Sequence, residues 1–432
     1  MKKIILLLLV IMLTIGLIVV VNDYGNIDVD DKELDSLQYI SDVVKKIDRE
    51  EINNDFIKWI YNKYGIDCLK KIIDLLDKDG YSETIWHQVT NNSYYVLKDL
   101  YDDRYEDMDN VKVIDGFGDK VISFVGDVSL ADNWYIMPKY DERNKGIYGI
   151  LSEGIVNIMN NSDIMVANNE FTISNRGEKM PGKYYTFRAY PERIKIYEEM
   201  GVDLVTLANN HVYDFGEEAF LDTLDTLNKY NIPYIGAGRD IDEAMKPYYF
   251  IINGYKVGFV NATRAEKIIL TPEATKDSGG VLRCYDPRIF MEVIKNTKKE
   301  SDFVVALVHY GKEDSHNLEV EQVDSSKKYI ESGADMVIGT HAHVLQGIEF
   351  YKDKPIFYNL GDFIFNNEDK ETGILQVKLD VNGKMEYYFI PAYQSGEYTK
   401  LLDGNEKNSI IDKMNKWSIN ANISYDGKVE WK

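Results

Sequence analysis

Residue types that bind metals recur at one kind of position in this chain: directly after short apolar runs with the composition of buried strands. Runs of this kind cover 121–125, 164–167, 204–207, 303–308 and 336–338. The carboxyl ends of strands in open α/β sheets meet at a shared crevice. We therefore expect the residues that follow these runs to lie together: Asp127, Glu170, Asn210, His211, His309, His341 and His343.

The chemistry of this set indicates divalent metal binding. Imidazole, carboxylate and amide donors suit Mn, Fe or Zn, and the absence of thiolates disfavours a structural zinc site. If the segment stays extended, His341 and His343 share one face and can reach one centre or two adjacent ones. Glu170 can bridge two ions, and a pair about 3.5–4 Å apart can activate water and stabilise attacking and leaving oxygens.

Each feature alone has an ordinary explanation. Gly126-Asp127 could be a turn, His309 a core histidine, and Asn209-Asn210 a helix N-cap. Their recurrence at every strand end, in a chain with only six histidines, favours a metal site.

Composition limits the alternatives. The chain has 432 residues, and its formal net charge of −22 argues against a nucleic-acid partner, which would need basic patches. The two cysteines, Cys68 and Cys284, exclude a disulfide framework and a cysteine-based zinc site.

The order of elements predicts an α/β fold. The apolar runs alternate with helical patterns at 191–200, 217–230, 286–300 and 319–333. Asn253-Gly254, Asp353-Lys354 and Asn382-Gly383 separate strand pairs and predict hairpins, so the sheet arrangement is mixed.

The N-terminus predicts a membrane anchor. Two lysines precede an uncharged run over residues 4–21, and aspartates follow it. As a helix the run would be about 27 Å long, close to the hydrocarbon core. The positive-inside tendency places the rest of the chain outside the cytoplasm, as a single-pass protein of the cell membrane. A cleaved signal peptide is the alternative, but the run is long and lacks a small-residue cleavage site.

Three regions result: an anchor (1–21), a helical stalk or interaction region (22–115) and an α/β domain (116–432). In the second region, apolar residues recur at three- and four-residue steps over 34–47, with shorter matches at 57–60 and 69–76.

Several of these segments resemble a known family. They are FVGD (124–127), ANNE (167–170), LANNHVYDFG (207–216), HYGKE (309–313) and GTHAHVLQGIEFYKDKPIFYNLGDFIF (339–365). Together they are similar to the CapA family of poly-γ-glutamate capsule-synthesis proteins, over about 120–395. The resemblance implies a fold like that of calcineurin-like metallophosphoesterases: a β-sandwich flanked by helices, with metals at the strand ends.

The resemblance also implies roles for the residues. Asp127 and His343 would hold one ion, Glu170 would bridge, and the second ion would bind the set Asn210, His309 and His341. His211 would act as the acid for the leaving group. Ser129 stands where the phosphoesterase motif has a histidine, which implies a weakly held first ion, and Asp362 adds a charge near the site.

Four more residues match family positions around the centre. Lys183 and Arg188 could grip a carboxylate or phosphate. Glu313 and Gln346 could hold a metal-ligating side chain in position without binding the metal themselves.

Two functions stay open. The first is a metal-dependent hydrolase acting on a phosphoester or an amide of an anionic polymer or its precursor. The second is a non-catalytic binding component of a complex with membrane-bound polymer-synthase subunits. Ser129 favours the second, whereas the intact Asn210-His211 and His341-x-His343 favour the first. A cytosolic phosphatase conflicts with the anchor.

Overall fold

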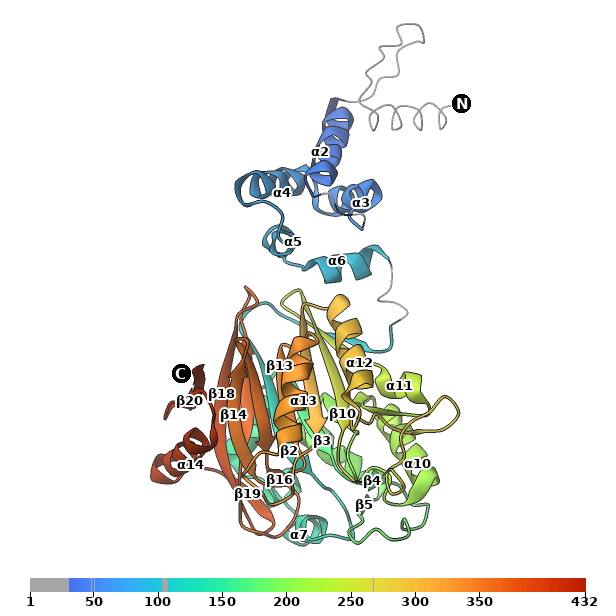
Figure 1. Cartoon of the computed structure of the whole chain (residues 1–432), viewed down its shortest axis with the longest axis vertical. Helices are drawn as coiled ribbons and strands as arrows, with labels where there is room; N and C mark the ends of the chain where they lie inside the picture. The colour runs from blue at the N-terminus through green and yellow to red at the C-terminus, as the bar shows by residue number, and fades with distance from the viewer. Residues whose placement is uncertain (1–30, 48, 50, 103–107, 267) are drawn as a thin grey trace, which may run out of the picture. The chain divides into compact units, whose positions relative to one another are not determined.

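The computed structural model describes residues 31–47, 49, 51–102, 108–266 and 268–432 (Figure 1). They belong to two compact units, and the boundary between these units in the sequence lies between Ile85 and Trp86. The predicted anchor at 4–21 lies outside the described residues. Within the described ranges, no helix combines the length and apolarity needed to cross a membrane.

The smaller unit is helical, as the apolar spacing predicts. It contains α2 (Asp31–Ile47), α3 (Asn54–Tyr64) and α4 (Ile66–Asp79), and α5 (Thr84–Thr90) begins at its end. The Asn53 side chain caps α3 by accepting a hydrogen bond from the Phe56 amide at 3.0 Å. Ile57, Ile60 and Leu69 are fully buried, so the apolar faces of α3 and α4 form the core of this unit.

The larger unit includes residues 86–102, which the sequence analysis grouped with the helical region. Here α6 (Tyr94–Tyr101) is tied to a hairpin of the sandwich. Lys256 Nζ lies 2.5 Å from Asp99 Oδ2, and His87 stacks on Tyr255 with ring centroids 4.0 Å apart. A Cβ at Gly254 would come within 1.9 Å of the Asn91 carbonyl oxygen, so this turn requires glycine.

Two large mixed sheets form the centre of the larger unit, beside two small sheets of two strands each: β4 (Thr172–Ile173) with β5 (Arg188–Ala189), and β8 (Ala237–Gly238) with β11 (Gly280–Val281). The seven-stranded sheet has the order β1 (Val111–Val113), β9 (Tyr248–Ile252), β10 (Tyr255–Thr263), β12 (Phe303–His309), β13 (Met336–Thr340), β15 (Lys354–Leu360), β14 (Leu345–Tyr351). The ten-stranded sheet has the order β20 (Ala421–Ile423), β21 (Lys428–Trp431), β18 (Met385–Ser395), β17 (Lys370–Leu379), β2 (Lys120–Val128), β3 (Ile164–Asn169), β6 (Leu204–Thr206), β7 (Tyr234–Ile235), with β16 (Asp362–Ile364) beside β2 and β19 (Tyr398–Leu401) beside β18. The predicted hairpins are confirmed as the antiparallel pairs β9–β10, β14–β15 and β17–β18.

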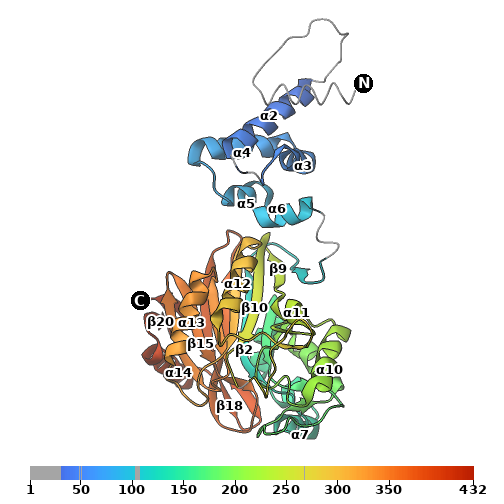
Figure 2. The same ribbon diagram turned by 45° about the vertical axis from the view of Figure 1, so that its right-hand side comes forward.

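The two sheets face each other as a sandwich. Phe124 and Val166 of one sheet belong to the same buried cluster as Phe259 and Leu307 of the other. Helices cover the outer faces: Figures 1 and 2 show α12 (Pro287–Lys299) and α13 (Val320–Glu331) along the seven-stranded sheet. The remaining helices of this unit include α7 (Ile136–Arg143), α8 (Glu153–Asn160), α9 (Lys195–Met200), α10 (Gly216–Lys229), α11 (Ile241–Met245) and α14 (Gly404–Trp417).

The predicted arrangement, two facing β-sheets with helices on their outer faces, is therefore confirmed. The strands that matter for the site are parallel within each sheet: β2, β3 and β6 in one, and β10, β12 and β13 in the other. Their carboxyl ends carry the predicted site residues to one edge of the sandwich.

Candidate metal centre

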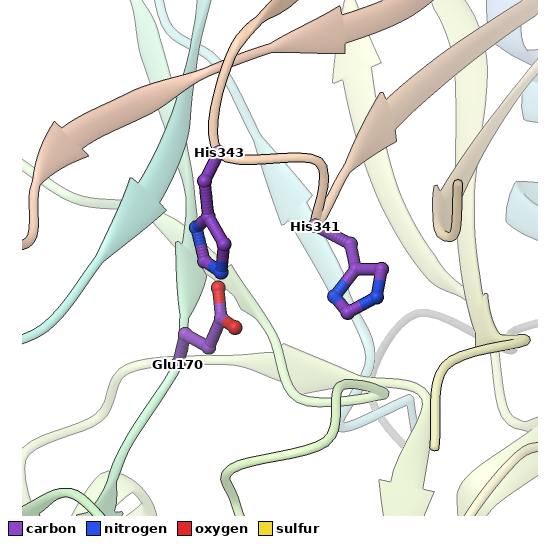
Figure 3. A group of neighbouring side chains, drawn as sticks. All are labelled: Glu170, His341 and His343. Atoms are coloured by element: carbon purple, nitrogen blue, oxygen red, sulfur yellow. The ribbon is translucent and has the colours of Figure 1, made fainter. Parts of the chain in front are cut away.

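Five of the predicted ligands converge in one buried cluster. Three overlapping groups have ligand atoms that all lie within 4.8 Å of one another. Figure 3 shows one of them, with the side chains of Glu170, His341 and His343 facing a common space. The groups are Glu170–His341–His343, Asp127–His343–Asp362 and Asp127–Glu170–His309.

Asp127 reaches the cluster because β2 is approached closely by β16. A Cβ at Gly126 would lie 1.8 Å from the Gly361 carbonyl oxygen, so only glycine allows this approach. The Asp127 amide donates to the same Gly361 oxygen at 3.0 Å. The Asp127 side chain is fully buried and accepts a hydrogen bond from Asn168 Nδ2 at 2.8 Å.

Asn168 lies at the centre of the polar network, which the sequence analysis did not anticipate. Its amide nitrogen also lies 3.2 Å from Glu170 Oε2, and its oxygen accepts from Thr206 Oγ1 at 3.0 Å and from Asn209 Nδ2 at 3.2 Å. Asn168 thus fixes the two acidic side chains relative to each other. Its position at the end of a predicted strand was the available signal.

Asn210 and His309 come together from opposite sheets. His309 Nε2 and Asn210 Oδ1 are 2.7 Å apart, and His309 Nδ1 lies 2.9 Å from Thr340 Oγ1. Glu170 Oε1 is 3.5 Å from His309 Nε2. These two predicted ligands of the second ion therefore contact each other, and one of them, His309, lies close to the predicted bridging carboxylate.

The His341-x-His343 segment is not extended, so the alternation of side chains along a strand does not apply to this pair. Both residues have left-handed backbone conformations, with φ of 94° and 57°. Such residues cost about 1–3 kcal/mol each unless their surroundings impose the conformation. Here Asp127 Oδ2 accepts a hydrogen bond from the His341 amide at 3.1 Å, which supports the turn. The two rings still face one space, with centroids 6.0 Å apart.

Burial and mutual contact shift the pKa values of the cluster. Burial raises the pKa of Glu170, and the nearby Asp127 charge adds to this. Burial lowers the pKa of His341 to about 3, and the neighbouring His343 contributes. Burial likewise lowers the pKa of His309.

Asp127 and His343 shift in the opposite directions to what burial alone would produce. Burial would raise the pKa of Asp127, but the hydrogen bond and positive charge of His343, with a smaller electrostatic contribution from His309, together outweigh burial and hold this pKa well below its usual range. Burial would lower the pKa of His343, but the Asp362 charge and the Asp127 hydrogen bond raise it. The result is a charged pair beside two neutral imidazoles.

The cluster has the donors that a divalent ion requires. Among the described residues, two of its buried polar atoms have no hydrogen-bond partner: Glu170 Oε1 and His341 Nδ1. The hydroxyl of Ser129, two residues after Asp127, is likewise buried without a partner in this part of the chain. Unpartnered buried polar atoms are rare because desolvation without a partner is costly. Oxygen and imidazole nitrogen donors fit Mn, Fe or Zn, so the residues present fit a metal centre.

His211 lies at the border of the cluster, held by Asp214. Its Nδ1 is 2.8 Å from Asp214 Oδ2, and its Nε2 is 4.0 Å from Glu170 Oε1. The Phe187 ring packs on the imidazole with centroids 4.4 Å apart. The sequence analysis did not give Asp214 a role, although its spacing of three residues from His211 was a signal.

Lys183 is paired inside the protein. Its ammonium lies 2.6 Å from Asp214 Oδ1 and 2.9 Å from Glu266 Oε2, donates to the Asn210 carbonyl, and its side chain is 2% exposed. This geometry supports the loop that bears Asn210 and does not support the prediction that Lys183 grips a substrate anion.

The other three predicted substrate residues lie around the cluster. Arg188 donates to the Gly177 carbonyl at 3.2 Å and stacks on Phe215 at 4.1 Å, so it holds a loop. Glu313 is 58% exposed and lies 4.0 Å from His341 Nε2, at the rim of the cluster. Gln346 is buried and donates to the Ser315 carbonyl at 2.8 Å, which orders the loop carrying Glu313.

The fold and site define a mixed α/β sandwich protein with a buried histidine and carboxylate cluster at the carboxyl ends of its strands. Residues 121–367 match the family described as "Bacterial capsule synthesis protein PGA_cap". The chain belongs to this family, which confirms the resemblance found in the sequence.

Two relatives make the relationship concrete. The PGA biosynthesis protein CapA of Bacillus subtilis (strain 168) is 29% identical over 325 residues, covering 72% of this chain and 83% of that protein. The capsule biosynthesis protein CapA of Bacillus anthracis is 29% identical over 272 residues, covering 60% and 65%.

Similarity to solved structures is more distant. A 5'-nucleotidase from Candida albicans SC5314 is 13% identical with a TM-score of 0.35, over 64% of this chain and 51% of that one. The match therefore spans about half of that nucleotidase, and this degree of likeness carries no argument about activity.

Proposed function

We propose that this chain is a membrane-anchored, extracytoplasmic protein that acts in the synthesis, export or tethering of a capsule polymer of the poly-γ-glutamate type. In this proposal it carries a two-metal hydrolase centre on a metallophosphoesterase-type sandwich. Family membership supports the process, and the apolar run over residues 4–21 supports the location. The anionic polymer or its precursor and membrane-bound synthase subunits are the proposed partners.

One observation carries the metal centre: the buried cluster contains overlapping ligand groups in which Glu170 Oε1 and His341 Nδ1 have no hydrogen-bond partner in the described part of the chain. Asp127 and His343 would hold one ion, Glu170 would bridge, and the second ion would be held by Asn210, His309 and His341. Bound divalent ions would supply Lewis acidity at the scissile ester or amide and would lower the pKa of water.

The chain's own residues supply proton transfer and positioning. Asp214 accepts a hydrogen bond from His211 Nδ1, so the other ring nitrogen, Nε2, faces the cluster; when the ring carries both protons, Nε2 can donate one to the leaving group. Phe187 limits rotation of that ring. Glu313 stands at the rim, where an incoming polymer segment would pass. The reaction class is metal-assisted hydrolysis of a phosphoester or a γ-glutamyl amide.

A specific observation favours the second candidate, a binding component without turnover. Ser129 presents a buried hydroxyl where the phosphoesterase motif has an imidazole, and within the described ranges this hydroxyl makes no hydrogen bond. A first ion with one fewer nitrogen ligand would be held weakly. The cluster would then bind the polymer or its precursor and would not cleave it.

A hydrolysis screen separates the two candidates. The full-length chain is assayed on phosphoesters and γ-glutamyl peptides with Mn²⁺, Fe²⁺ or Zn²⁺, beside His341→Ala and a His316→Gln control. His316 stacks on Trp417 and lies outside the cluster. Turnover that is lost only in His341→Ala supports the hydrolase. No turnover with retained polymer binding supports the binding component.

Cell fractionation with N-terminal sequencing tests the location. We expect the intact N-terminus in the membrane fraction. A soluble mature form beginning near residues 22–30 would overturn the anchor.

A further inference from the structure

Asp362 is a fully buried carboxylate of the cluster that the proposed ligand set does not use. Strand β16 runs parallel to β2, and the register pairs Asp362 with Asp127. Asp362 Oδ1 lies 2.7 Å from His343 Nδ1, closer than Asp127 Oδ2, which lies 3.3 Å from the same nitrogen. The nearest contact of this carboxylate is therefore the imidazole of a proposed metal ligand.

The second oxygen of Asp362 is held by other parts of the chain. Asn366 Nδ2 donates to Asp362 Oδ2 at 3.1 Å, and Lys370 Nζ lies 3.6 Å from it. Lys370 also pairs with Asp314 at 3.0 Å and with Glu368 at 3.1 Å, and its side chain is only 12% exposed. Both oxygens of Asp362 are thus engaged, in contrast to Glu170 Oε1, which has no hydrogen-bond partner among the described residues.

His343 is fixed in one orientation by these contacts. Phe365 packs on its ring with centroids 4.6 Å apart. Figure 3 shows the ring nitrogen farther from the backbone pointing at the Glu170 carboxylate. Because Nδ1 faces Asp362, the nitrogen offered to the cluster is Nε2.

We infer that Asp362 is a positioning residue for the first metal ion: it accepts the His343 Nδ1–H, and Lys370 and Asn366 hold it in place for this purpose. The inference rests on the proposed function, since it concerns the ion that His343 would bind. A carboxylate behind a ligating histidine fixes the tautomer and the ring orientation, and its loss typically lowers metal affinity about 10–100-fold. The alternative is direct ligation by Asp362, whose oxygen lies within 4.8 Å of the Asp127 and His343 ligand atoms.

Mn²⁺ titration of the full-length chain, followed by calorimetry and electron paramagnetic resonance, distinguishes these roles. We expect Asp362→Ala to lower the affinity for one of the two ions about 10–100-fold. Asp362→Asn should stay close to wild type, because its amide oxygen can accept the same hydrogen bond. Asp314→Asn is the matched control, since it removes a carboxylate from the same lysine without touching His343.

Two results would overturn the inference. The first is Asp362→Asn losing as much affinity as Asp362→Ala, because the charge and not the hydrogen bond would then matter. The second is additive losses in His343→Ala/Asp362→Ala, because a residue that acts only through His343 adds nothing once that ring is gone. Circular dichroism checks that each variant folds.

Failure of the proposed function gives a different pattern. If wild type binds no Mn²⁺, the metal centre fails, and the metal role of Asp362 fails with it. If wild type binds two ions and Asp362→Ala binds them equally well, only the positioning role fails. The metal-free protein provides a second readout: a downfield proton signal from His343 Nδ1–H that Asp362→Ala removes. Its absence from wild type would also overturn the inference.

Discussion

Asp214 holds His211 by a hydrogen bond of 2.8 Å between Asp214 Oδ2 and His211 Nδ1. The other oxygen of Asp214 pairs with the buried ammonium of Lys183 at 2.6 Å. This arrangement keeps the imidazole at the border of the cluster, with Nε2 4.0 Å from Glu170 Oε1. Asp214 therefore orients His211 toward the proposed metal ligands, and Lys183 in turn holds the Asp214 carboxylate in place.

If the chain turns over substrate, His211→Ala should affect rate more than metal binding. Its neighbour Asn210 is the proposed ligand, and general acid catalysis typically contributes about 10²–10⁴-fold. We expect kcat to fall by about that factor with unchanged metal content. Steady-state kinetics and metal analysis of one preparation check both. A variant as fast as wild type would refute the proposed acid.

Ser129→His should strengthen binding of the first ion. The Ser129 hydroxyl is buried and, in the described structure, unpartnered, so an imidazole here would add a donor. The larger side chain should cost about 1–3 kcal/mol of stability through overpacking. Ser129→Leu controls for volume, because it fills the space without a ligand atom. Mn²⁺ affinity that is the same in both variants would count against the assignment of the first ion.

The ion pair between Lys256 and Asp99 should be a major link between α6 and the sandwich. The side chains are 1% and 6% exposed, with Nζ and Oδ2 2.5 Å apart. Lys256→Met should lower the free energy of unfolding by about 3–5 kcal/mol, because it leaves the carboxylate buried without this partner. Lys256→Met/Asp99→Leu should recover much of this loss.

The exposed pair of Lys112 and Asp203 provides the control for that experiment. Its lysine side chain is 47% exposed, so Lys112→Met should change stability by less than about 1 kcal/mol. Urea unfolding measures all of these variants. Equal effects of the two lysine substitutions would contradict the structural role of Lys256.

Cys284 should make stability fall at alkaline pH. Burial raises the pKa of this thiol from 9.0 to about 11. The folded state therefore keeps the proton that the unfolded state loses, so the contribution is complete below pH 9 and is lost as pH rises toward 11. Two pKa units correspond to about 2.7 kcal/mol.

Cys284→Ala tests this dependence, since other titrating groups remain in both proteins. In urea unfolding, the free energy of unfolding should fall less between pH 8 and pH 10.5 for the variant than for wild type. Parallel pH profiles would contradict the assignment to Cys284.

Local sequence patterns predicted the parts of the site that depend on strand ends. Asp127, Glu170, His309 and His341 lie at the carboxyl ends of strands whose apolar runs are visible in the sequence, and the parallel order of those strands brings them together. The hairpin turns were also predictable from local sequence, because Asn-Gly and similar pairs have strong conformational preferences.

The remaining features depend on tertiary contacts that no local pattern contains. Asp362 meets Asp127 only because β16 pairs with β2, and Lys183 is buried because its loop folds onto Asp214. The left-handed conformation at His341 is supported by the hydrogen bond from its amide to Asp127. A sequence pattern shows which residues could act, whereas the pairing of distant strands decides what each of them contacts.

Metal content is the most direct test of the central claim. The full-length chain, His309→Ala, His341→Ala and the His316→Gln control are purified identically, loaded with Mn²⁺ and analysed by elemental analysis and paramagnetic resonance. We expect two coupled ions per chain in wild type and in the control, and fewer in both cluster variants. No bound ion in wild type, or unchanged content in both variants with circular dichroism showing an intact fold, would contradict it.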